Sequence, residues 1–149
     1  KATELGTVRI VPVIAARSTA KPPAGRAASR LIRWRRIAEA AAAQCGRTRI
    51  PVIEPPVPLA QALGHLPDGP VLVFTLNGSG APLESVLSRL RGAEGASVLI
   101  GPEGDFTSDE VALAVRAGGV AVRFGGAVLR SETAAVAVLA VLQQSVGAL

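Results

Sequence analysis

Residues 97–124 read SVLIGPEGDFTSDEVALAVRAGGVAVRF, and this stretch decides the fold. The apolar run Ser97 to Ile100 predicts a buried strand, and the glycine-bearing segment Gly101 to Phe106 predicts a loop. A helix is expected over Thr107 to Ala117, followed by a second strand over Val120 to Phe124. Two strands joined by a helix need a crossover connection, which indicates parallel pairing.

The ends of this helix have clear local signals. Thr107 and Glu110 have the spacing of a capping box, in which the side chain of each residue accepts a hydrogen bond from the backbone N–H of the other. Gly118 and Gly119 supply the stop, because glycine ends a helix easily. The boundaries therefore follow from residues within the segment itself.

The same alternation continues through the rest of the chain. Val8 to Ile14 predicts a strand in which Pro12 favours an edge position or a bulge. The remaining predicted elements are a helix over Arg26–Cys45 stopped by Gly46, a strand over Arg49–Ile53, at most a short helix over Pro58–Leu66, a central strand over Val71–Leu76, a turn over Asn77–Gly80, a helix opened by Pro82, and a long helix over Ser131–Val146. Alternating strands and helices imply the α/β class, with a mostly parallel sheet flanked by helices on both faces.

Composition limits the possible classes of protein. The chain has 149 residues, of which 49% are hydrophobic and 18% charged, which suits one globular domain. The longest apolar run, Ala134 to Leu142, is much shorter than the roughly 18 to 20 residues of a membrane span. Cys45 is the single cysteine and His65 the single histidine, so the sequence excludes an internal disulfide and a structural zinc site within one chain.

The charge favours a phosphate-bearing partner. The net charge is +5, and Lys1 and Lys21 are the only lysines, so arginine carries most of the positive charge. The guanidinium group binds phosphate through paired hydrogen bonds, although a GC-rich genome that encodes arginine for lysine would give the same composition. Aromatic residues make up only 3%, which argues against base stacking as the main mode of RNA contact.

Three loops are the candidate sites, because ligands of parallel sheets bind at the carboxyl ends of the strands. These loops follow Leu76, Ile100 and Phe124. Segment Gly101 to Phe106 precedes a helix N-terminus, where free N–H groups can receive polar atoms, but a tight turn explains its glycines equally well. Its spacing matches neither the dinucleotide fingerprint nor the phosphate loop of nucleoside triphosphatases.

The start of the final helix is the second candidate. Ser131 is expected to cap the helix, and Glu132 is favoured by the helix dipole. Arg130 is not explained in this way, because a cation at a helix N-terminus opposes the dipole. An acidic partner or an anionic ligand accounts for it more simply.

Several motifs in order resemble one family. They are Gly101-Pro102-Glu103-Gly104 with Phe106-Thr107 and Glu110, Val128 to Ala134, Arg33 to Ala40, Gln44 to Arg47, and Lys1 to Gly6. Together they resemble the RsmE family of ribosomal RNA methyltransferases over nearly the whole chain. The resemblance implies that residues 1–149 form a SPOUT-type methyltransferase domain with a C-terminal trefoil knot that holds S-adenosylmethionine. It also implies a cytoplasmic homodimer that methylates N3 of a uridine in the 16S rRNA of the small ribosomal subunit, with no membrane and no metal.

The resemblance also implies an N-terminal PUA-like RNA-binding domain, which we expect to be absent from these 149 residues. Lys1 to Gly6 reads as the last turn of a helix capped by Gly6, so we expect the chain to be a fragment that follows such a domain.

The resemblance assigns roles to particular residues. Arg130 is the expected catalytic residue, and Glu103 or Glu132 orients it or takes a proton. Arg17 and Ser18 match a loop expected to face RNA, although a solvated loop arginine is nearly as good an interpretation. The cofactor would be enclosed, largely by backbone groups, at Leu76, Ile100, Gly101, Gly104, Phe124, Leu129, Ser131 and Ala134.

Four positions depart from the family pattern. Ala16, Ala43 and Ala127 stand where charged residues are usual, and Asp105 stands where glycine is common. Two alternatives stay open: a non-catalytic RNA-binding or ribosome-assembly module with the same fold, and a SPOUT methyltransferase that acts on tRNA or on a ribose hydroxyl.

Overall fold

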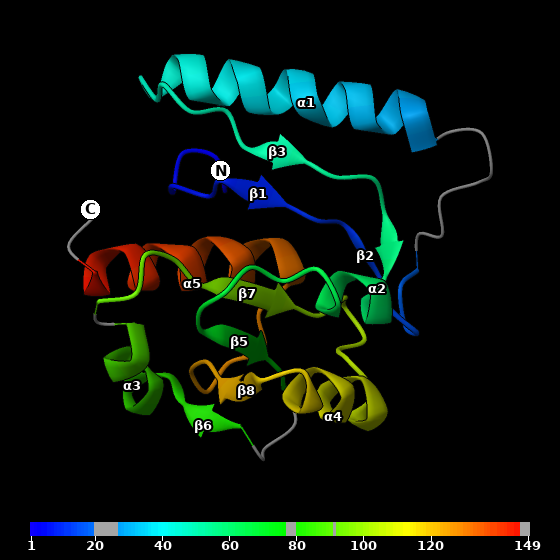
Figure 1. Ribbon diagram of the computed structural model, residues 1–149, viewed down its shortest axis with the longest axis vertical. Helices are drawn as coiled ribbons and strands as arrows, with labels where there is room; N and C mark the ends of the chain where they lie inside the picture. Colours follow the sequence, from blue (N-terminus) through cyan, green and yellow to red (C-terminus); the bar gives the residue numbers. More distant parts are fainter. Residues whose placement is uncertain (20–26, 77–79, 91, 147–149) are drawn as a thin grey trace.

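A four-stranded parallel sheet forms the centre of the computed structural model, which describes residues 1–19, 27–76, 80–90 and 92–146 (Figure 1). Its strands are β5 (Val71–Phe74), β6 (Ala81–Pro82), β7 (Ser97–Ile100) and β8 (Gly119–Arg123), in the order β6-β8-β5-β7. Phe74 at the end of β5 lies opposite Ile100 and Val122, so three strands end at the same edge. The predicted parallel sheet is confirmed.

Helices cover both faces of this sheet, as predicted. Helices α2 (Leu59–Leu63) and α4 (Ser108–Arg116) pack on Val71 and Val73 of one face. Leu72 and Phe74 of the other face contact α3 (Leu83–Val86), the 3-10 turn η1 (Leu87–Leu90) and α5 (Ser131–Ser145). Successive strand residues point to opposite faces, and all four residues of β5 are buried, which explains its unbroken apolar sequence.

The N-terminal third adds two short parallel pairs and one long helix. Strand β1 (Arg9–Ile10) pairs with β3 (Val52–Ile53), and β2 (Val13–Ile14) pairs with β4 (Val57–Pro58). The strand predicted over Val8–Ile14 is thus divided in two at Pro12, whose carbonyl accepts a hydrogen bond from Val57 N at 3.0 Å. Helix α1 (Ala27–Gln44) lies along β3.

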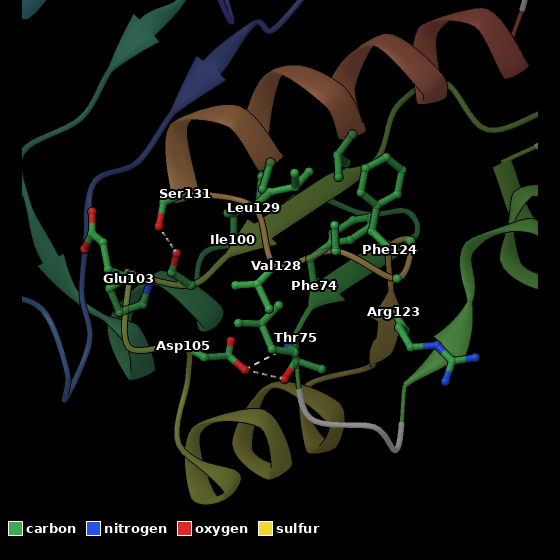
Figure 2. A pocket seen from close by; sticks show the side chains of 18 residues that line it. Phe74, Thr75, Ile100, Glu103, Asp105, Arg123, Phe124, Val128, Leu129 and Ser131 are labelled. Carbon is green, nitrogen blue, oxygen red and sulfur yellow. Dashed lines mark hydrogen bonds between the residues drawn. The ribbon is translucent and has the colours of Figure 1, made fainter.

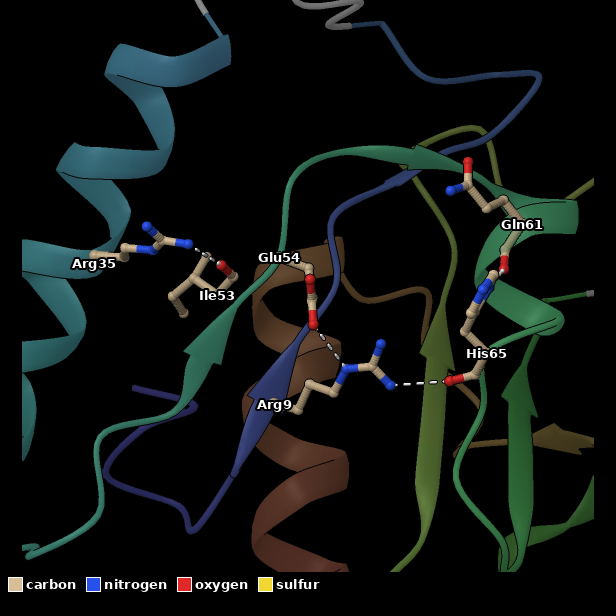
Figure 3. A network of polar contacts seen from close by, with 6 residues as sticks. All are labelled: Arg9, Arg35, Ile53, Glu54, Gln61 and His65. Atoms are coloured by element: carbon tan, nitrogen blue, oxygen red, sulfur yellow. Dashed lines mark hydrogen bonds and ion pairs between the residues drawn. The ribbon is translucent and has the colours of Figure 1, made fainter.

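A polar network joins these N-terminal elements (Figure 3). Arg9 Nε lies 3.2 Å from Glu54 Oε1, and Arg9 Nη1 donates to the His65 carbonyl at 2.9 Å. Arg35 on α1 donates to the carbonyl of Ile53 at 3.3 Å. Exposed ion pairs contribute little energy, so the network mainly fixes how β1, β3 and α1 lie together.

Most local predictions are confirmed, with differences at the ends of elements. The capping box of Thr107 and Glu110 is present, and Lys1–Gly6 forms a single turn in which Gly6 has a φ of 88°. Strands β4 and β6 were not predicted. Residues 20–26, which include the first residue of the helix predicted over Arg26–Cys45, and residues 77–79, which are most of the predicted turn, lie outside the described residues.

The described residues contain neither a candidate membrane span nor a candidate metal site. None of the helices within the described ranges is both long and apolar enough to span a bilayer. In the same part of the chain, no three His, Cys, Asp or Glu residues gather as a metal site would require.

Candidate functional site

A cavity of about 510 Å³ opens at the edge where β5, β7 and β8 end (Figure 2). It has the size typical of small-molecule sites. Residues from four segments line it: Phe74–Leu76 at the end of β5, Ile100–Glu103 and Asp105 at the end of β7, Arg123–Leu129 at the end of β8, and Ser131, Ala134 and Val138 of α5. All three loops selected from the sequence therefore meet at one cavity.

The cavity brings together most of the predicted site residues. Its lining includes Glu103 and seven of the eight predicted cofactor residues: Leu76, Ile100, Gly101, Phe124, Leu129, Ser131 and Ala134. Gly104 and Arg130 are not part of the lining. Arg130 is exposed and occupies the N-cap position of α5, next to the lining residue Ser131, and the described residues offer it no ion pair.

Ser131 has a different local role from the one predicted. The prediction that it caps α5 was wrong, because Arg130 holds the N-cap position without a side-chain capping bond. The Ser131 hydroxyl instead donates to the carbonyl of Gly101 at 2.8 Å. This bond ties the first turn of α5 to the loop after β7, across the cavity wall.

Gly101 is required by close packing. A Cβ atom at this position would lie 2.9 Å from Asp105 Oδ1 and 3.0 Å from the backbone N of Phe106. Because one of these contacts is to backbone, a side chain would force the loop to shift.

Asp105 is a site residue that the sequence did not identify. It is 8% exposed and has a φ of 58°, a left-handed conformation that glycine adopts more easily. Its Oδ2 accepts hydrogen bonds from Thr75 Oγ1 at 2.9 Å and from the Leu76 N–H at 2.8 Å. The carboxylate thus joins the end of β5 to the loop after β7. The signal that could have identified Asp105 in the sequence is an acidic residue at a position where the family commonly has glycine.

Gly104 and Arg17 form a contact beside the cavity. Arg17 Nη1 donates to the Gly104 carbonyl at 2.8 Å, and a Cβ atom on Gly104 would lie 3.1 Å from the Cβ of Arg17. Gly104 therefore makes room for the Arg17 side chain. Ser18 acts locally, since its Oγ accepts a hydrogen bond from Ala15 N at 3.0 Å.

Glu110 connects this N-terminal segment to α4. Its carboxylate accepts from Ala16 N at 2.8 Å and from Thr107 N at 2.9 Å. Partial burial acts to raise the pKa of Glu110, but hydrogen bonds from Thr107 and Ala16, together with the nearby charge of Arg17, outweigh it and lower that pKa. The segment around Arg17 is thus fixed to the loop that carries Glu103 and Asp105.

The walls combine apolar surface with backbone polar groups. Phe74 and Phe124 pack edge to face with ring centroids 6.2 Å apart, and Val128 and Leu129 add further apolar surface. Gly125 and Gly126, which belong to the lining, are exposed and contribute backbone polar groups. Such a cavity can receive a ligand that has a flat apolar part and several hydrogen-bonding groups.

The domain matches a known protein family. A family model described as an RNA methyltransferase domain matches residues 1–143. This chain belongs to that family. The predicted resemblance and α/β fold of SPOUT type are confirmed, whereas the trefoil knot stays a prediction.

Relatives of this RNA methyltransferase domain are named ribosomal RNA small subunit methyltransferase E. The protein from Mycobacterium tuberculosis is 32% identical over 142 residues, which cover 93% of this chain and 53% of the relative. The protein from Bacillus subtilis is 31% identical, with 90% of this chain and 54% of the relative covered. The chain thus spans about half the length of these curated relatives.

Solved structures match the domain closely. A putative methyltransferase from Legionella pneumophila, in complex with the cofactor SAM, has a TM-score of 0.88 and 30% identity over 97% of this chain and 58% of its own. Ribosomal RNA small subunit methyltransferase E from Neisseria gonorrhoeae, bound to S-adenosyl methionine, has a TM-score of 0.86 and 33% identity over the same shares.

Proposed function

We propose that this domain binds S-adenosylmethionine in the 510 Å³ cavity and transfers the methyl group to N3 of a uridine in the 16S rRNA of the small ribosomal subunit. One observation carries the proposal: the family motifs at 101–104 and 128–134 contribute to the walls of the same cavity. The two neighbours described above were crystallised with this cofactor.

The residues present fit this cofactor. The apolar surface of Phe124, Val128 and Leu129 suits an adenine ring, and backbone groups of the loops that line the cavity suit its hydrogen-bonding edge. The residues that would hold it are Leu76, Ile100, Gly101, Phe124, Leu129, Ser131 and Ala134. Gly104 would act from outside the lining, by holding Arg17 against the loop.

Two side chains would act on the uridine. The bound cofactor supplies a methyl group on a positively charged sulfur, so that the N3–C bond forms as the C–S bond breaks, with its electron pair staying on sulfur and the N3 proton leaving. Arg130 would stabilise the negative charge that spreads to the uracil oxygens. Glu103 lines the cavity and Glu132 does not, which supports Glu103 as the residue that takes the proton or orients Arg130.

The proposed function also includes RNA contacts, the place of this domain in a longer protein, and its oligomeric state. Arg17 and Ser18 would contact RNA, and the bond from Arg17 to Gly104 puts its guanidinium beside the cavity. Residues 1–149 would form the SPOUT methyltransferase domain of a longer protein, with the knot near the C-terminus. It would act as a homodimer in the cytoplasm, where small ribosomal subunits are found.

Calorimetric titration with S-adenosylmethionine tests the first part, with ATP and NAD as controls. We expect selective, saturable binding of the cofactor. Transfer is then measured on small ribosomal subunits with the full-length protein, followed by mapping of the methylated atom. Absence of binding in a folded sample would favour a non-catalytic RNA-binding module. A methyl group on tRNA or on a ribose hydroxyl would contradict the proposed substrate.

A further inference from the structure

The charged side chains that line the cavity differ in burial. Glu103, Asp105 and Arg123 all belong to the lining, but Glu103 and Arg123 are exposed, whereas Asp105 is 8% exposed. In Figure 2 the Arg123 side chain points away from Thr75 and Asp105. The buried charge of this wall is therefore a carboxylate.

The Asp105 carboxylate is held in a fixed position. Oδ2 accepts from the Thr75 hydroxyl and from the Leu76 amide, while Oδ1 lies against Gly101, 2.9 Å from where a Cβ would stand. Within the described residues no donor is bonded to Oδ1. Because a left-handed φ of 58° is easier for glycine, the local backbone does not favour aspartate at this position. The side chain's contacts compensate for that strain.

A fixed negative charge acts differently on the two forms of the cofactor. S-adenosylmethionine has a positively charged sulfur, and the demethylated product, S-adenosylhomocysteine, has a neutral thioether. Charge interactions are weakly screened in a partly buried wall, so a carboxylate there favours the cation.

We propose that Asp105 is a specificity-determining residue, which makes the cavity prefer the cationic cofactor over its neutral product. The inference rests on the proposed function. At a separation of several ångströms and an intermediate dielectric constant, the preference that Asp105 would contribute is about tenfold in the ratio of dissociation constants.

The decisive variant is Asp105→Asn. The amide oxygen can accept both bonds that Oδ2 accepts, so the wall keeps its connection to β5 while the negative charge is removed. Asp109→Asn is the matched control, because Asp109 is exposed in the first turn of α4 and outside the lining. Dissociation constants for S-adenosylmethionine and S-adenosylhomocysteine are measured by calorimetry for each protein, and melting curves verify folding.

We expect Asp105→Asn to reduce the preference for the cation about tenfold, while Asp109→Asn leaves it unchanged. An unchanged ratio in folded Asp105→Asn would overturn the inference. If the wild-type domain binds neither compound, the proposed function fails instead, so the two failures are distinguishable.

A second variant addresses the case in which Asp105→Asn does not fold. Asp105→Gly removes the charge and suits the left-handed φ of 58°. The ratio of the two dissociation constants should again fall about tenfold toward equal binding. A ratio equal to that of wild type in folded Asp105→Gly would contradict a role for the charge.

Discussion

Replacement of Glu110 by alanine should destabilise the domain and release the segment around Arg17. In the native protein the Glu110 carboxylate accepts hydrogen bonds from Ala16 N, Thr107 N and Thr107 Oγ1, at 2.8, 2.9 and 3.2 Å. The bond to Ala16 crosses 94 positions of sequence and is a direct link between the N-terminal segment and α4.

The expected loss is about 2 kcal/mol in the free energy of unfolding. Half of a capping box is worth about 1 kcal/mol, and a hydrogen bond from the Ala16 amide to a charged acceptor adds a similar amount once its exposure to solvent is taken into account. For a domain of this size, that loss lowers the melting temperature by about 4 to 8 °C.

The effect depends on pH in a defined direction. The pKa of Glu110 is lower in the folded protein than in the unfolded chain, since the hydrogen bonds from Thr107 and Ala16 overcome the opposing effect of burial. Its stabilising contribution is therefore complete above the unfolded value of about 4.3, and it is lost as pH falls through the lowered pKa of the folded state.

Chemical denaturation of wild type and Glu110→Ala at pH 7 and near pH 3 measures both effects. The difference in stability should be largest at pH 7 and should shrink in acid. Asp109→Ala is the control, because it removes an exposed carboxylate from the same turn and should cost under about 1 kcal/mol. Equal effects of the two substitutions, or a difference that grows in acid, would refute the reasoning.

Three further substitutions test the cavity wall. Gly101→Ala places a Cβ 3.0 Å from Phe106 N, so we expect a loss of about 1 to 3 kcal/mol and weaker cofactor binding by calorimetry; a change below about 0.5 kcal/mol would show that the loop yields easily. Ser131→Ala removes the donor to the Gly101 carbonyl and should cost about 1 kcal/mol in denaturation, whereas no loss would mean that the bond contributes nothing. Arg130→Ala should abolish methyl transfer by the full-length protein while melting temperature and cofactor affinity stay close to wild type, and unchanged turnover would remove Arg130 from the mechanism.

The sequence predicted elements whose signals are local. Strand β7 has the predicted bounds, and α4 begins at the predicted capping box, because both are determined by residues inside the segment. Strands β4 and β6 each contain two residues, the second of which is proline. Such a short segment has no strand propensity that could be recognised in the sequence. Their pairing with β2 and β8 depends on the tertiary arrangement.

The site also has features that local sequence predicts and features that depend on the tertiary arrangement. The rule that ligands bind at strand ends located the cavity, since the end of a strand can be read from the sequence. The bonds of Asp105 to Thr75 and of Arg17 to Gly104 cross 30 and 87 positions, so the roles of these side chains became visible only in the folded chain. Ser131 was misassigned for the same reason, because its partner Gly101 lies 30 positions away.

The strand order has a consequence for how the domain assembles. Strand β6 follows β5 in the chain, yet β8 lies between them in the sheet and comes from residues 119–123. During synthesis the facing edges of β5 and β6 must stay open until this later segment arrives, and such long-range pairing slows folding. The loop after β8 forms one wall of the cavity, and α5, which follows it in the chain, supplies another, so ligand binding reports that both of these late segments are in place.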